Sequence, residues 1–150
     1  MATNNRRSFE VINYSGEADY PREFFVNLEF RKNMIEYCAK SEANRRAMWI
    51  KCARDPLFYI NTFVYTFDPR LEPNVIPFIT YAFQDHAILR LIKAIDEGRD
   101  IAIEKSRDMG VSWVTLAVLE WYWKFKSRQS FLLLSRKEEL VDKTDSMDAL

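Results

Sequence analysis

The stretch DIAIEKSRDMGVSW, residues 100–113, decides the fold that we predict from this sequence. Its first five residues are a short run with β-branched side chains, which is typical of a strand. Residues 105–110 then indicate a turn, and an aromatic helix is expected over 111–126. A second apolar run, residues 130–134, predicts another buried strand. Strand, loop, helix and strand in this order predict a β-α-β unit, whose parallel strands bind ligands at their carboxyl ends.

The chain before this unit predicts a mainly helical lead-in. Helical spacing or capping residues indicate four helices, over 23–40, from Ser41, from Asp55-Pro56 to near Asp68, and over 84–97. A loop is expected over 71–77, a short extended segment over 78–81, and a last helix after Ser135. We therefore predict a polar arm at 1–20, a helical lead-in at 21–75, and an incomplete α/β core at 76–150.

Composition limits the classes of function. The 150 residues carry 22 Lys+Arg and 22 Asp+Glu, so the chain as a whole lacks a basic nucleic-acid footprint. Two cysteines without a CxxC pair and a single histidine do not form a metal-cluster pattern, and they predict reduced, buried thiols. The apolar runs fall short of the roughly 20 residues that cross a bilayer. We expect an intracellular protein that does not enter membranes.

The loop after the first predicted strand resembles a phosphate-binding loop with one change. The usual pattern is GxxxxGK[ST] between a strand and a helix. Here Gly110 and Ser112 are in place, Lys105 replaces the first glycine, and Val111 occupies the usual lysine position. The alternative is an ordinary strand-to-helix turn. The phosphate-binding interpretation predicts the start of a P-loop NTPase-type parallel sheet.

In that interpretation each part of the loop has a role. Peptide N–H groups along the loop face the phosphates, which assigns contacts to Ser106, Arg107, Asp108, Met109, Gly110 and Val111. Lys105 reaches the β- and γ-phosphates of ATP, and the Ser112 hydroxyl is the expected ligand of Mg²⁺.

Three segments in order resemble the large subunit of phage DNA-packaging terminases. KSRDMGVSW resembles the family's phosphate loop with the lysine moved to the front. DPLFYINTFVYTFDPR, residues 55–70, is similar to the stretch upstream of the ATPase core, and PFITYAFQDHAI, residues 77–88, to the adenine-recognition segment. The resemblance implies an ATPase that drives double-stranded DNA into a procapsid in the host cytoplasm. It also implies a portal protein and a small subunit as partners, a homo-oligomeric ring, and a separate nuclease domain.

Two further residues receive roles beside this resemblance. The Gln84 amide can pair with the N6 and N7 edge of adenine, while one of the aromatics before it, Tyr81 or Phe83, stacks on the ring; Tyr81 is the preferred candidate. Alternatively, Gln84 merely caps or opens its helix. Arg107 is the candidate catalytic residue, an arginine finger that neutralises the γ-phosphate. Its alternative is an exposed arginine paired with Asp108 or Glu104.

The acidic residues that such ATPases need are missing after Ser112. No apolar strand ending in Asp-Glu follows, so we expect the metal-binding aspartate, the catalytic glutamate and the nuclease carboxylates beyond residue 150. Residues 1–150 alone are then expected to bind nucleotide weakly and to hydrolyse little. Two other functions remain open: a helicase-like DNA translocase, and a non-catalytic module in which residues 22–70 dock a portal or small subunit.

Overall fold

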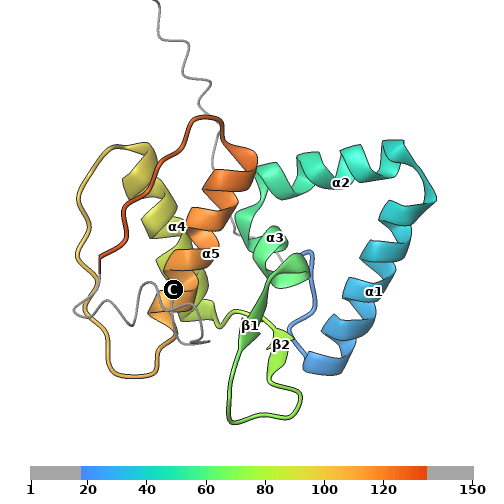
Figure 1. Ribbon diagram of the computed structural model, residues 1–150, viewed down its shortest axis with the longest axis horizontal. Coiled ribbons are helices and arrows are strands. Elements are labelled where there is room, and N and C mark those ends of the chain that lie inside the picture. Colours follow the sequence, from blue (N-terminus) through green and yellow to red (C-terminus); the bar gives the residue numbers. More distant parts are fainter. Residues whose placement is uncertain (1–17, 135–150) are drawn as a thin grey trace, which may run out of the picture. The chain divides into compact units, whose positions relative to one another are not determined.

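The computed structural model describes residues 18–134, and the chain divides between Asp85 and His86 into two compact units. Figure 1 shows the elements along the chain. Their bounds are α1 (Phe24–Lys40), α2 (Glu42–Arg54), α3 (Pro56–Phe63), β1 (Tyr65–Phe67), β2 (Val75–Pro77), α4 (Ala82–Asp96) and α5 (Val111–Phe125). The first unit contains everything up to the first turn of α4, and the second contains the rest of α4 and α5.

Capping residues set the starts of the first three helices. The Glu23 carboxylate accepts from Val26 N at 2.8 Å, and the Ser41 hydroxyl accepts from Asn44 N at 3.1 Å. Asp55 accepts from Phe58 N at 2.8 Å, with proline at the first helical position. These bonds satisfy N–H groups that a helix start leaves without partners. The starts predicted at Ser41 and at Asp55-Pro56 are confirmed.

The predicted end of α3 near Asp68 is wrong. The helix stops at Phe63, and residues 65–67 form β1, which pairs antiparallel with β2 in the register Tyr65 with Pro77 and Phe67 with Val75. The last three residues of the predicted loop over 71–77 therefore belong to a strand. A buried arginine of α1 accounts for the helix end, because Arg31 donates to the carbonyl oxygens of Asn61 at 2.8 Å and Val64 at 2.9 Å.

Arg31 is a buried cation that organises the first unit. It is 1% exposed, its Nε donates to Asn27 Oδ1 at 2.6 Å, and its guanidinium lies 4.8 Å from the Tyr65 ring centroid. Burial lowers the pKa of Arg31, yet arginine keeps its charge in proteins. The positive group faces carbonyls at the C-terminus of α3, where the helix dipole favours a cation. Around it the apolar core is formed by Leu57, Phe58 and Ile60.

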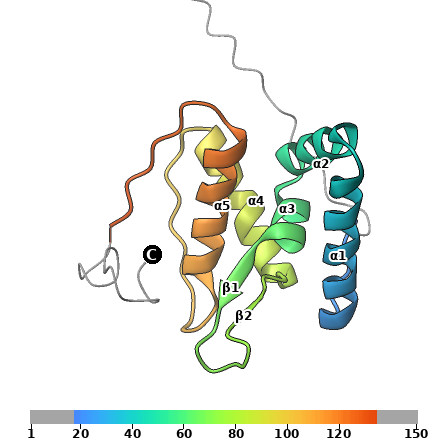
Figure 2. The ribbon, with the colours of Figure 1, turned by 45° about the vertical axis from the view of Figure 1, so that its right-hand side comes forward.

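The second unit is a pair of helices. Figures 1 and 2 both show α4 and α5 side by side. Ile88 and Ile92 of α4 and Val114 and Val118 of α5 are buried, so each helix hides one apolar face. Tyr122 on α5 donates to Asp96 on α4 at 2.7 Å, which joins the two helices through a partly buried hydrogen bond.

The predicted α/β fold with a parallel sheet is wrong for the described residues. Within residues 18–134, the sheet is the antiparallel pair of β1 and β2, and the chain is otherwise mainly helical. Residues 100–104 and 130–134 form no strands, and Ile101, Ile103 and Leu132 are 39%, 40% and 83% exposed. A buried parallel strand needs neighbours and cover on both faces. A short β-branched run provides neither the neighbouring strands nor the cover. The helix expected after Ser135 lies outside the described residues.

Candidate functional site

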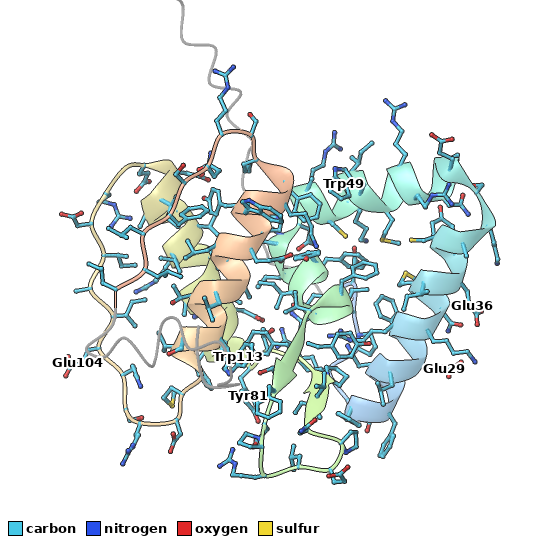
Figure 3. The ribbon with its side chains drawn as sticks, in the orientation of Figure 1. Glu29, Glu36, Trp49, Tyr81, Glu104 and Trp113 are labelled. Atoms are coloured by element: carbon cyan, nitrogen blue, oxygen red, sulfur yellow. The ribbon has the colours of Figure 1, made fainter. Side chains whose placement is uncertain are left out.

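The loop from Lys105 to Ser112 leads directly into α5, as the sequence predicts. α5 begins at Val111, one residue after the glycine of the loop pattern. Residues 105–108 are exposed, Met109, Gly110 and Val111 are half-buried, and Ser112 is exposed. Glu104, labelled in Figure 3, precedes the loop and is also exposed. A ligand can therefore approach the loop and the start of the helix from solvent.

The backbone of the loop takes an unusual course at two residues. Asp108 has a φ of 62° and Gly110 a φ of 70°, both in the left-handed region. Glycine adopts this region without steric cost, which explains why glycine suits position 110. Gly110 is also the N-cap of α5 and gives the helix no side-chain cap. N–H groups at an uncapped helix start after a left-handed turn favour an anion.

The charged side chains of the loop are exposed. Within residues 18–134, neither Lys105 nor Arg107 forms an ion pair. The pairing of Arg107 with Asp108 or Glu104, which the alternative interpretation requires, is therefore not seen. Asp108 would contribute its N–H, because its carboxylate would repel a phosphate. Lys105 and Arg107 would supply the positive charge.

Gln84 lies in the first unit, in the first turn of α4. It is 6% exposed, and its Oε1 accepts from Tyr81 N at 3.0 Å. This bond closes the start of the helix, as the alternative interpretation of Gln84 predicts. A carboxamide oxygen has two lone pairs, so this bond does not exhaust its capacity as an acceptor. Because Gln84 is almost fully buried, a base could contact its amide only through the small part of the side chain that solvent reaches.

Two aromatic rings lie beside Gln84. Tyr81 and Phe83 stack with centroids 5.6 Å apart and an interplanar angle of 7°. Tyr81, labelled in Figure 3, is 67% exposed, and Phe83 is 47% exposed. An exposed ring stacked on a second one is a rigid, flat apolar surface. The sequence offers both aromatics as stacking rings near Gln84, with Tyr81 preferred, and both are exposed in the structure.

A buried polar cluster surrounds the start of α4, and no pattern in the sequence indicated it. Asn61 donates from Nδ2 to Thr80 Oγ1 at 2.9 Å and accepts from Thr80 N at 2.8 Å. The single hydroxyl proton of Thr80 goes to Asp85 Oδ1 at 2.5 Å, which in turn pairs with Arg22. Burial, and next the charge of Asp85, raise the pKa of Tyr20 beside this cluster to about 12. Asn61 lies 19 residues before Thr80, and Arg22 lies 63 residues before Asp85, so no local sequence pattern marks this cluster.

The described residues contain neither a cluster of metal ligands nor a helix that could cross a membrane. Within residues 18–134, no three His, Cys, Asp or Glu side chains gather as a metal site. A Mg²⁺ ion held by Ser112 and phosphate oxygens would not form such a group, so this finding leaves the predicted site untouched. None of the helices in the described part of the chain has the length and apolar character needed to cross a bilayer.

No protein-family model, curated protein or solved structure matches this chain. The functional interpretation therefore depends on the loop, the segment around Gln84 and the resemblance in sequence.

Proposed function

We propose that this chain is the ATP-binding N-terminal part of a viral DNA-packaging motor, similar to a terminase large subunit. The observation that carries the proposal is the loop of residues 105–112. Its lysine and arginine are exposed without ion pairs among residues 18–134, and its glycine opens an uncapped helix in the left-handed conformation. The proposal does not depend on a parallel sheet, which the described residues lack.

In this function the loop binds the triphosphate. N–H groups from Ser106 to Val111 surround the phosphate oxygens, and Lys105 neutralises charge on the β- and γ-phosphates. Arg107 approaches the γ-phosphate, where charge changes during transfer. Ser112 and phosphate oxygens would hold Mg²⁺, which screens the phosphate charge when bound.

In the first unit, taken by itself, we propose that residues Tyr81 to Gln84, which we call the base-recognition segment, bind adenine. The stacked rings of Tyr81 and Phe83 offer an exposed surface for a nucleobase, and the Gln84 amide offers a donor and an acceptor to N7 and N6. A guanine presents the opposite hydrogen-bonding group at position 6, so this segment favours ATP over GTP. In the assembled motor, double-stranded DNA, a portal protein, a small subunit and further copies of the chain are the partners.

The decisive test is nucleotide binding by the Lys105→Ala variant. A fluorescent ATP analogue titrated with Mg²⁺ should bind the parent and bind the variant at least about tenfold more weakly, because one charge-assisted phosphate contact is lost. Lys93→Ala is the matched control, since Lys93 is 65% exposed and its ion pair, at 3.8 Å, is with Glu97, which lies just after α4. Equal affinities of Lys105→Ala and Lys93→Ala would refute the role of the loop.

A docking module is the second candidate, and exposed apolar side chains favour it. Phe25 and Ile35 on α1 are 75% and 57% exposed, and Trp49 on α2, labelled in Figure 3, is 53% exposed. Large apolar groups in water are common at sites of protein association. This function predicts binding of a portal or small subunit without nucleotide. Loss of that binding in Phe25→Ser, with no effect of Lys105→Ala, would select it.

A further inference from the structure

Arg22 contacts the two residues that flank the base-recognition segment and lie 58 and 63 residues later in the chain. Its Nη1 donates to the carbonyl oxygen of Thr80 at 2.6 Å. Its Nη2 forms an ion pair with the carboxylate of Asp85. Thr80 is the residue before the segment and Asp85 the residue after it. One planar guanidinium therefore joins the two ends of a four-residue stretch.

The two contacted residues are themselves fixed. Thr80 is 2% exposed, and Asn61 on α3 binds both its N–H and its hydroxyl. Thr80 in turn donates to Asp85 at 2.5 Å, which closes a ring of contacts that includes Arg22. The Tyr20 ring lies 5.5 Å from the guanidinium carbon and is 5% exposed. Arg22 completes this network from the exposed side, where its side chain is 39% accessible.

Between these anchors lie the exposed rings of Tyr81 and Phe83 and the buried amide of Gln84. Its stacked rings and the bond from Tyr81 N to Gln84 Oε1 define one local conformation. A site that is held in its binding conformation before the ligand arrives loses less entropy on binding. The anchors determine whether the rings and the amide keep their relative placement.

We propose that Arg22 is a positioning residue for nucleobase recognition, acting through Thr80 and Asp85 without touching the nucleotide. This inference rests on the proposed function, because it assumes that the base-recognition segment binds adenine. Arginine is required because its fork serves a carbonyl and a carboxylate together. A lysine ammonium at this position keeps the charge for Asp85 but cannot span both acceptors in the same planar geometry.

The test separates base recognition from phosphate binding. The purified protein is loaded with a fluorescent ATP analogue, which is displaced by ATP, by GTP or by inorganic tripolyphosphate. The variants are Arg22→Ala, Arg22→Lys and Gln84→Ala. Arg70→Ala is the matched control, because Arg70 is 82% exposed and its ion pair is to Asp68, two residues away. Circular dichroism confirms that each variant is folded.

Arg22→Ala should reduce the preference for ATP over GTP by roughly tenfold, close to the effect of Gln84→Ala, since a bidentate base contact is worth about that factor or more. Tripolyphosphate should displace the analogue equally well from the parent and from Arg22→Ala. Arg22→Lys should show an intermediate preference, and Arg70→Ala none of these changes. A selective loss of base preference is not expected if Arg22 only stabilises the fold.

Each other result has a defined meaning. If the parent shows no preference for ATP, base recognition fails and the role of Arg22 fails with it. If the parent and Gln84→Ala behave as expected while Arg22→Ala keeps the full preference, only the Arg22 inference is overturned. Should Arg22→Ala fail to fold, Arg22→Lys decides by the same ratio: an undiminished preference overturns the inference and a reduced one supports it.

Discussion

Replacing Asn61 by alanine removes the side chain that joins the end of α3 to the residue before the base-recognition segment. Asn61 is fully buried. Its Oδ1 is the acceptor for Thr80 N at 2.8 Å, and its Nδ2 donates to Leu57 O and to Thr80 Oγ1, both at 2.9 Å. The alanine variant leaves the buried N–H of Thr80 without this acceptor and loses two further hydrogen bonds.

The expected loss follows from these three contacts. A buried donor without a partner costs about 1–3 kcal/mol, and each further hydrogen bond contributes about 0.5–1.5 kcal/mol. The free energy of unfolding should therefore fall by roughly 2–6 kcal/mol, a large part of the roughly 5–15 kcal/mol typical of a domain. With a urea m-value of about 2 kcal/mol/M, the midpoint moves down by about 1–3 M.

Urea denaturation followed by far-ultraviolet circular dichroism measures this shift. Asn33→Ala is the matched control, because Asn33 is exposed in the middle of α1. There the same substitution should change stability by less than about 0.5 kcal/mol. A midpoint for Asn61→Ala no lower than that of Asn33→Ala would refute the reasoning, because it would show that the buried network does not stabilise the fold.

Two other predictions concern stability. Burial raises the pKa of Tyr20 from 10.0 to about 12, so its hydroxyl ionises in the unfolded chain at a lower pH than in the folded protein. The contribution of the neutral Tyr20 hydroxyl to the free energy of unfolding is therefore full below pH 10 and is lost as the pH rises towards 12. Between pH 9 and pH 11 the free energy of unfolding should therefore fall by about 1 kcal/mol more in the parent than in Tyr20→Phe. Equal shifts of the urea midpoint in the two proteins over this pH range would contradict this. Gly98 has a φ of +63° with open space around the position of a Cβ. Gly98→Ala should therefore lower the free energy of unfolding by about 1–2 kcal/mol through backbone strain alone, and Gly98→Asn by less. Thermal denaturation of both variants checks this order. A larger loss in Gly98→Asn than in Gly98→Ala would contradict it, because a steric clash would affect the larger side chain more.

Local signals made the helices predictable. Ser41 and Asp55 bind N–H groups three residues ahead, so the cause of each helix start lies within one turn of sequence. Gly98 lies just past α4 in the left-handed region, where glycine is favoured. The same locality made the start of α5 predictable from Gly110 and Val111.

Distant contacts made the rest unpredictable. α3 ends at Phe63, where a side chain 30 residues earlier binds the carbonyl oxygen of Asn61. Residues 64–67 are β-branched or aromatic and favour a strand, but their pairing with residues 75–77 is not a local property. The short β-branched run at residues 100–104 predicts a strand, but pairing needs a second segment, and a local pattern describes only the first. In the candidate site, the loop and Gln84 were predicted from contiguous motifs. Arg22 and Thr80 could not be, since their roles depend on chain segments that meet only after folding.

The anchoring of residues 81–84 from both sides has a consequence for how this turn can evolve. Thr80 and Asp85 are fixed by buried groups, whereas Tyr81 and Phe83 between them are exposed. Mutations at these two aromatic positions leave the scaffold contacts intact, so they alter the surface offered to a ligand at little cost in stability. A lineage that keeps the anchors can therefore exchange one ligand preference for another through single substitutions. Protein engineers can randomise the same two positions first.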